Sequence, residues 1–261
     1  MPDHREDLTS ALTDSDPVRR AQIQMLKPLP KRFYAEASVG EAEGGGYRVL
    51  LDGKTVRTPA GTPFAVPVRA LADLLANEWN AQLDVIDPAR MPATRIVNTA
   101  LDGVAKDVRS VFDDILKFAG TDLVCYRAEA PEGLVQRQNA FWNPVLRFAE
   151  NRFGARFLVT EGIVHQAQPP EAIAAFAEAL RSYATPLGLA CLHTITTLTG
   201  SALLALAYAE GRLDAGQIWK AAHVDEDWQA EHWGVDAEAA ERREARWIEL
   251  ETATRVLETL R

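Results

Sequence analysis

The sequence LGLACLHTITTLTGSALLALAYA, residues 187–209, is the longest apolar stretch of the chain. Its length approaches that of a membrane span, but it contains a histidine, four threonines and a serine, which make insertion into lipid costly. In a globular protein, a helix that is apolar on every side is buried in the core. We therefore expect residues 187–209 to form one buried helix around which other helices pack.

Amphipathic patterns predict helices on both sides of this stretch. Leu71, Leu74, Leu75 and Trp79 recur at intervals of three and four residues, as the buried stripe of a helix does. Glycines at 120, 154 and 234 suit helix ends. Further helices are predicted at residues 104–118, 134–152, 170–183, 215–233 and 237–260, and a short strand at 156–160.

Before residue 68 the pattern is that of extended chain. In YRVLLDGKTVRTPAG, residues 47–61, Asp52 and Gly53 suit a two-residue type I′ turn between two strands. The predicted fold class is α+β. We expect a flexible N-terminal arm (residues 1–30), a small antiparallel β domain with one helix (31–100) and a larger, mostly helical C-terminal domain (101–261).

Charge and cysteine content exclude several classes of function. A net charge of -9 disfavours nucleic acid and anionic membranes, because both attract basic surfaces. The two isolated cysteines, Cys125 and Cys191, provide neither a disulfide framework nor a paired-cysteine zinc site, which favours a reducing compartment. The N-terminus has no secretory or transit pattern. These features predict a cytoplasmic protein without membrane insertion.

Motifs for nucleotide binding and hydrolysis do not fit. Gly53, Lys54 and Thr55 suggest a phosphate loop, but Arg48 occupies the place of its first glycine and a strand is predicted where a helix is needed. Ser201 lies in an apolar helix pattern, not in a nucleophile elbow. Cys125 follows apolar residues and is interpreted as a core thiol. We expect no nucleotide, no cofactor and no enzymatic activity.

One constellation leaves an enzymatic alternative open. His223, Asp227 and Glu231 are spaced by four residues, so on a helix they share a face and could bind a divalent metal ion. No second cluster supplies the further ligands that such sites need. A solvated acidic helix face is the simpler interpretation.

The segment DEDWQAEHWG, residues 225–234, combines four carboxylates with two indoles. Tryptophan is enriched at binding hot spots. On a helix, Trp228 and Trp233 point about 140° apart, so only one can face the core squarely. We therefore expect different roles for the two, with the carboxylates as the better contact candidates. In the alternative interpretation, both indoles pack internally and the acids stabilise a helix N-terminus.

Nine ordered motifs resemble one family, the chaperones that assist assembly of F1 ATP synthase by attending its alpha subunit, called F1 complex assembly factor 2 in mitochondria. The resemblance covers roughly residues 31–235. Its motifs are KRFY (31–34), LDGKTVRTPAG (51–61), Glu78-Trp79, MPATRIVNTALD (91–102), GTDLVCYR (120–127), QNAFWNP (138–144), VTEGIVH (159–165), HTITTLTGSALLALA (193–207) and DEDWQAEHWG (225–234).

This resemblance implies a fold, a partner and a location. The fold is an N-terminal antiparallel β domain followed by a helical domain. The function is to bind newly made alpha subunit and shield surfaces that neighbouring beta subunits later cover, without ATP hydrolysis, in the bacterial cytoplasm. A stable structural subunit of a complex stays an alternative. The matching contact candidates are Glu226, Asp227, Trp228, Glu231 and Trp233. Trp79, Tyr126 and Arg127 match equally well, and a purely architectural role is the alternative interpretation for these three.

Overall fold

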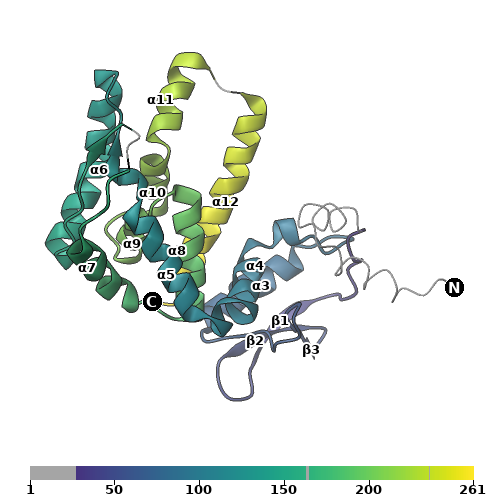
Figure 1. Cartoon of the computed structure of the whole chain (residues 1–261). Coiled ribbons are helices and arrows are strands. Elements are labelled where there is room, and N and C mark those ends of the chain that lie inside the picture. Colours follow the sequence, from purple (N-terminus) through teal and green to yellow (C-terminus); the bar gives the residue numbers. More distant parts are fainter. Residues whose placement is uncertain (1–27, 163–164, 235) are drawn as a thin grey trace, which may run out of the picture.

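The structure, a computed structural model, describes residues 28–162, 165–234 and 236–261. Figure 1 shows a small sheet with two helices at the lower right, and the remaining helices standing beside them. This arrangement confirms the predicted α+β class. Most of the predicted N-terminal arm, residues 1–27, lies outside the described residues.

The sheet contains four short antiparallel strands. The long pair, β1 and β2, is joined in register with Ala37 opposite Leu51. Strands β3 and β4 both pair with β2, at opposite ends of it. The strands are β1 (Ala37–Glu41), β2 (Tyr47–Leu51), β3 (Lys54–Thr55) and β4 (Ala65–Val66).

The predicted hairpin turn and first helix are confirmed. Asp52 and Gly53 have φ values of 47° and 77°, as the two central positions of a type I′ turn require. Helix α3 (Arg69–Asn80) then lies against β1 and β2. Its Leu71 and Leu75 are fully buried, so the helix face predicted from the sequence to be apolar is the face that packs in the core.

A second helix, α4 (Pro92–Asp102), lies in the region where the sequence predicts only one. The Glu78 carboxylate, at the end of α3, accepts hydrogen bonds from the backbone N–H groups of Ala93 (2.7 Å) and Thr94 (2.8 Å) in its first turn. Burial raises the pKa of Glu78. Helix α4 packs against α8 and α12, and so joins the β part to the helical part.

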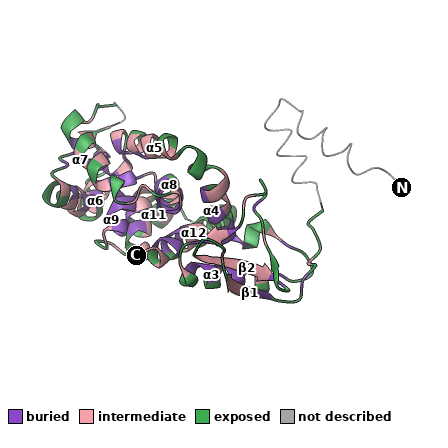
Figure 2. Ribbon diagram, turned by 90° about the horizontal axis from the view of Figure 1, so that it is seen from below, coloured by how far each residue is buried: buried purple, intermediate pink, exposed green. Residues whose placement is uncertain are grey.

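The helical part is built around two apolar helices, α8 (Pro186–Thr199) and α9 (Ala202–Ala209) (Figure 2). The other helices of this part are α5 (Val108–Gly120), α6 (Glu132–Phe153), α7 (Pro170–Arg181), α10 (Ala215–Ala222), α11 (Val224–Trp233) and α12 (Ala237–Thr259). Single 3-10 turns lie at Pro88–Arg90, Val104–Lys106 and Leu123–Cys125.

The predicted single core helix at residues 187–209 is wrong at one point. Gly200 adopts a left-handed conformation, φ 68°, and ends α8, and Ser201 caps α9 by accepting a hydrogen bond from Leu204 N at 3.0 Å. Burial is as predicted for α9, all eight of whose residues are buried, whereas α8 exposes Thr197 to solvent. The break lets the two helices pack against each other rather than continue in one line.

A buried carboxylate holds the N-terminus of α9. Asp122 is completely buried and accepts hydrogen bonds from the backbone N–H groups of Leu203 (2.9 Å) and Val124 (3.1 Å). Burial raises the pKa of Asp122 to about 6. The partial positive charge of the helix N-terminus favours an anion at this position.

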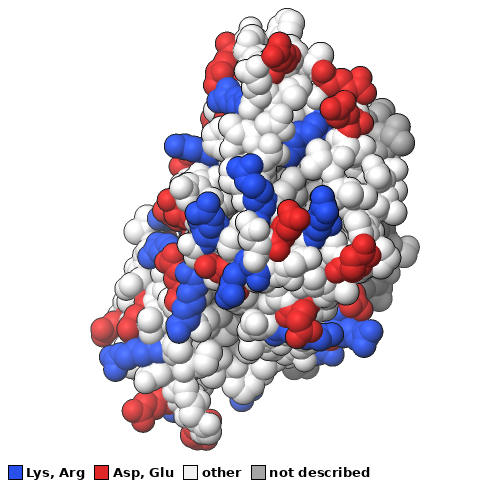
Figure 3. Space-filling view, turned by 90° about the vertical axis from the view of Figure 1, so that its left-hand side faces the viewer, with Lys and Arg blue, Asp and Glu red and all other residues white. Residues whose placement is uncertain are grey.

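Two further features complete the fold. The strand predicted at 156–160 is wrong in extent: β6 (Thr160–Glu161) is its only strand part, and it pairs in parallel with β5 (Tyr126–Arg127). Across the described residues, no helix has the length and apolar character needed to cross a membrane. The face turned to the viewer in Figure 3 carries Lys and Arg interspersed with Asp and Glu, so the net negative charge is not uniform over the surface.

Candidate partner-binding surface

The acidic tryptophan segment forms its own helix, α11. The single helix predicted at residues 215–233 is wrong, because the chain turns at His223 between α10 and α11. His223 is buried, with Nδ1 2.8 Å from the carbonyl oxygen of Trp219 and its ring 3.8 Å from the Trp219 ring centroid. Burial lowers the pKa of His223, so the ring is neutral near pH 7. This turn sends α11 away from the core.

Three acids occupy the first turn of α11: Asp225, Glu226 and Asp227. Negative charges at this end of a helix interact favourably with the helix dipole, typically by about 0.3–1 kcal/mol each. The acids therefore have a structural role in addition to any contact with a partner.

Polar contacts fasten one face of α11 to α6. Gln138 donates a hydrogen bond from Nε2 to the Asp225 carboxylate at 2.7 Å. One turn and a half further on, the Arg137 guanidinium pairs with the Glu231 carboxylate at 2.7 Å. The Arg137 side chain lowers the pKa of Glu231. These two carboxylates are thus engaged within the protein.

Trp228 lies on the same face and packs against the start of α6. Its ring is so close to Gly133 that a Cβ at that glycine would lie 2.7 Å from the indole. On the other side the indole stacks on His232, with ring centroids 4.3 Å apart. Trp228 is half-buried, and its role in this structure is to seat α11 on α6.

A third carboxylate connects α11 to α12. Asp227 Oδ1 lies 2.6 Å from an Arg243 guanidinium nitrogen, and both side chains are about one-third exposed or less. Arg243 also faces the Trp219 ring, 5.9 Å from its centroid. Asp227 is therefore part of the link between the two helices.

Three members of the predicted set on α11 are exposed: Trp233, Glu226 and Glu231. Trp233 is 87% exposed at the end of α11, and the Glu226 and Glu231 side chains are 59% and 54% exposed. The structure thus separates the two indoles, as the helical spacing predicts. Three of the four carboxylates have partners within the protein, whereas the Trp233 indole faces solvent.

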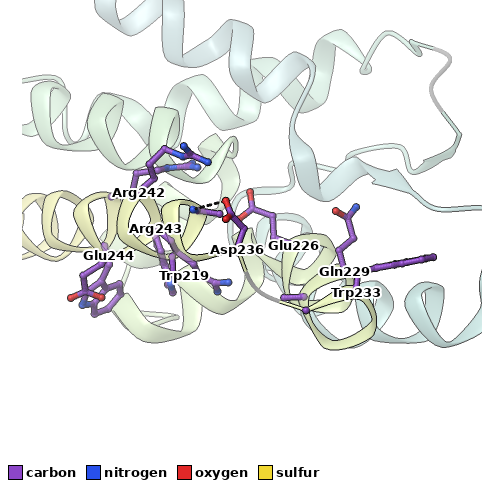
Figure 4. Close-up of a pocket in the computed structure, with 14 residues that line it drawn as sticks. Trp219, Glu226, Gln229, Trp233, Asp236, Arg242, Arg243 and Glu244 are labelled. Carbon is purple, nitrogen blue, oxygen red and sulfur yellow. Dashed lines mark hydrogen bonds between the residues drawn. The ribbon is translucent and has the colours of Figure 1, made fainter.

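Helices α11 and α12 diverge and leave a groove of about 810 Å³ between them (Figure 4). Helix α11 packs on α6, while α12 packs on α8 and α4. We call this space the α11–α12 groove. Its lining consists of Trp219, Glu226, Gln229, Ala230, Trp233, Gly234, Asp236, Ala239, Ala240, Arg242, Arg243, Glu244, Arg246 and Trp247.

Comparison with known proteins agrees with this fold along nearly the whole chain. The family described as ATP12 chaperone protein matches residues 31–150. A candidate chaperone from Agrobacterium tumefaciens is 57% identical, with a TM-score of 0.88 over 98% of this chain and 96% of that one. Atp12 from Paracoccus denitrificans is 37% identical, with a TM-score of 0.82 over 89% and 99% of the two chains. The chain belongs to the ATP12 chaperone family. A mutant of the Paracoccus protein matches with the same identity and TM-score.

Trp79, another predicted contact residue of this ATP12-family protein, lies in the β part, far along the chain from α11. Its ring meets that of Tyr34 edge-on at 5.7 Å, and the Tyr34 hydroxyl donates to the Trp79 carbonyl oxygen at 2.6 Å. Trp79 is half-buried. These contacts support the architectural interpretation of this residue.

Tyr126 and Arg127 lie on β5. Arg127 is buried, with its guanidinium 4.8 Å from the Trp142 ring centroid and a hydrogen bond to Asn143 Oδ1 at 3.1 Å. The Tyr126 hydroxyl is 3.2 Å from His165 Nδ1. Arg127 thus has a structural role in the interior, and the stretch GTDLVCYR contributes mainly to the core.

Gln138 connects the residue that follows this stretch, Ala128, to α11. The Gln138 side chain accepts a hydrogen bond from Ala128 N at 2.8 Å through its oxygen and donates to Asp225 at 2.7 Å through its nitrogen. Gln138 was not among the predicted contact residues, although it begins the QNAFWNP stretch, residues 138–144. Its place in one of the nine stretches that carry the family resemblance is the signal that could have indicated it.

The alternative metal site does not assemble. His223 is buried between helices, while Asp227 pairs with Arg243 and Glu231 with Arg137 on another face. Among the described residues, no group of three or more His, Cys, Asp or Glu side chains is placed to hold a metal ion. The shared face predicted for these three residues is lost because the helix breaks at His223.

Proposed function

We propose that this ATP12-family protein is an assembly chaperone that binds the unassembled alpha subunit of F1 ATP synthase, in the bacterial cytoplasm, and shields its subunit interface until the F1 hexamer forms. Family membership supports the chaperone role. The alpha subunit as partner, and the location, come from the resemblance of the nine motifs.

One observation supports α11 as the contact element. Trp233 is 87% exposed on a helix that Glu231 fastens to α6 and Asp227 fastens to α12. Fully exposed tryptophan is costly in water and is enriched at binding hot spots. A fixed helix that presents a free indole beside an open groove is suited to cover apolar surface on another protein.

The mechanism needs only equilibrium binding. An unassembled subunit exposes apolar interface that promotes aggregation. The chaperone covers part of that interface, and the true neighbouring subunit displaces it by burying the same surface more favourably. No nucleotide is required for this exchange.

The direct test is aggregation of purified alpha subunit measured by light scattering, with and without this protein, together with co-purification of the two. We expect a complex and suppressed scattering, and release of the chaperone on addition of beta subunit. Equal aggregation with and without the protein, and no complex, would refute the proposal.

The structural-subunit alternative makes a different prediction. A stable subunit is retained in stoichiometric amounts in mature ATP synthase, whereas a chaperone is absent from it. Quantitative mass spectrometry of purified enzyme distinguishes the two. The metal-enzyme alternative predicts bound metal in the purified protein, which elemental analysis measures.

A further inference from the structure

The α11–α12 groove combines large aromatic surfaces with walls of small residues. Trp219 and Trp247 meet edge-on at 5.4 Å in its lining, and Trp233 lies at the end of α11. Ala230 on α11 and Ala239 and Ala240 on α12 line it as well. Alanine walls leave room for side chains that come from elsewhere.

The first half of α12 depends little on the rest of the protein. From residue 237 to residue 246, every residue except Arg243 is exposed. A surface helix normally buries one apolar face against its own core. Here three turns of helix project beside the groove, and the alanines are small enough for a bound segment to approach the backbone.

The positively and negatively charged side chains of the groove differ in whether they have partners within the protein. The three arginines of the groove are engaged: Arg243 pairs with Asp227, Arg242 pairs with Glu238, and Arg246 donates to the carbonyl oxygen of Leu198 in the last turn of α8 at 2.7 Å. The C-terminus of a helix carries partial negative charge that suits a cation.

Within the described ranges, three carboxylates of the groove have no lysine or arginine partner: Glu226 lies in the first turn of α11, Asp236 caps α12 by accepting a hydrogen bond from Ala239 N at 3.2 Å, and Glu244 lies further along α12. Glu226 lies 3.7 Å from His223 Nε2, but that ring is neutral near pH 7 because burial disfavours its charged form. The groove therefore presents one exposed indole, Trp233, and two half-buried ones, Trp219 and Trp247, beside these three carboxylates.

We propose that the α11–α12 groove holds a short segment of the alpha subunit in which bulky apolar side chains are flanked by lysine or arginine. This inference rests on the proposed function. Apolar side chains cover the Trp219–Trp247 pair, and the cations meet Glu226, Asp236 and Glu244. Indole faces also attract cations, by roughly 0.5–2 kcal/mol per contact. An acidic segment would meet three carboxylates that have no lysine or arginine partner in the described part of the chain and is disfavoured.

The first experiment locates the contact. The photo-crosslinking amino acid benzoylphenylalanine replaces Ala240 in the groove and, as a control, the exposed Glu171 on α7. Each variant is mixed with purified alpha subunit and irradiated, and the joined peptide is sequenced by mass spectrometry. We expect a crosslink from position 240 only, to a peptide with apolar and basic residues.

The second experiment tests the charge. The double variant Glu226→Lys with Glu244→Lys reverses two groove charges, and Glu41→Lys with Glu171→Lys makes the same change in net charge at exposed positions elsewhere. We expect the groove variant to weaken alpha-subunit binding at least tenfold, with a smaller difference at high salt, and the control to stay within twofold.

The outcomes are distinguishable. A normal complex with no crosslink at position 240 and no effect of groove charge reversal overturns the groove assignment and leaves the proposed function standing. A crosslink to an acidic peptide, or between two copies of this chain, also overturns it. Absence of any complex with the wild-type protein overturns both proposals.

Discussion

At the scale of single residues, the decisive contrast is between two tryptophans five positions apart. Trp228 packs on Gly133 and stacks on His232, whereas Trp233 faces solvent. The same residue type therefore stabilises the fold at one position and is available to a partner at the other. Substitution of each should affect different measurements.

Trp233→Ala should weaken alpha-subunit binding by roughly 30-fold, the effect of a typical hot-spot residue of about 2 kcal/mol. It should change the free energy of unfolding by less than about 0.5 kcal/mol, because the side chain makes few contacts. Titration calorimetry and urea denaturation measure the two quantities. Leu83→Ala, which removes an apolar side chain of 69% exposure in the β part, is the matched control. Equal binding by the two variants would contradict the assignment.

Asp122 should make stability depend on pH in a defined direction. Its pKa is 3.8 in the unfolded chain and about 6 in the folded protein, so between these values the folded state binds more protons. Asp122 therefore contributes its full stabilisation of the folded state at pH values below 3.8. This contribution decreases as the pH rises and is lost above about 6.

Asp122→Asn removes this titration. The destabilisation caused by the substitution should therefore be larger at pH 4.5 than at pH 7.5, by on the order of 2 kcal/mol. Urea denaturation of both proteins across this range gives the difference. Asp107→Asn, at the exposed start of α5, is the control. A difference that grows with pH would show that burial of the charge is not the governing effect.

At the scale of elements, α11 is positioned by its neighbours more than by its own sequence. Apolar side chains do not gather on one face of α11. The helix is held instead by contacts with Gln138, Arg137 and Gly133 of α6 and with Arg243 of α12. At Gly133 the indole of Trp228 occupies the space that a side chain would fill.

Gly133→Ala should loosen this seat. Alanine favours a helix by up to about 1 kcal/mol over glycine, but its Cβ would lie 2.7 Å from the Trp228 ring and displace it, at a cost of about 1–3 kcal/mol. In Gly216→Ala on α10, the added Cβ would lie 3.4 Å from its nearest neighbour, so the substitution gains helix propensity without a steric clash. We expect Gly133→Ala to be the less stable and to show faster amide exchange in α11. Equal stability would mean that the indole moves freely.

The same geometry guides the choice of a charge variant on α11. Glu231→Lys would place two cations together, because Arg137 lies 2.7 Å from that carboxylate, and would disturb the α6 contact as well as any partner contact. Glu226 has no such arginine and is the cleaner position to test.

At the scale of the whole molecule, the β part and the helical part share one core. A continuous cluster of buried apolar residues extends from Tyr34 in the β part to Leu257 in α12. Helix α4 lies between the two parts and contacts α3, α8 and α12. A boundary near residue 100, as proposed from the sequence, falls inside this helix.

We expect a single cooperative unfolding transition for the whole chain, because neither part can open without exposing the shared core. Differential scanning calorimetry should give equal calorimetric and van't Hoff enthalpies. Fluorescence and far-ultraviolet circular dichroism should report the same midpoint. Two separated transitions would instead support independent β and helical domains.

Local patterns were sufficient to predict the fold class, the hairpin at Asp52-Gly53, α3, and the burial of residues 187–209. Periodicity and turn chemistry are properties of neighbouring residues, so they can be read without the fold. The break at Gly200 does have a local signal, a glycine that ends one helix followed by a serine that caps the next, which the apolar residues on both sides obscure. The break at His223 has no glycine or proline to mark it.

Only the tertiary structure decided which members of the acidic tryptophan segment are free. Asp225, Asp227 and Glu231 are engaged by Gln138, Arg243 and Arg137, which come from distant parts of the chain. The α11–α12 groove likewise depends on two helices packing on different neighbours. A side chain's availability to a partner is determined by contacts across the fold, and these contacts leave no periodic trace in the sequence.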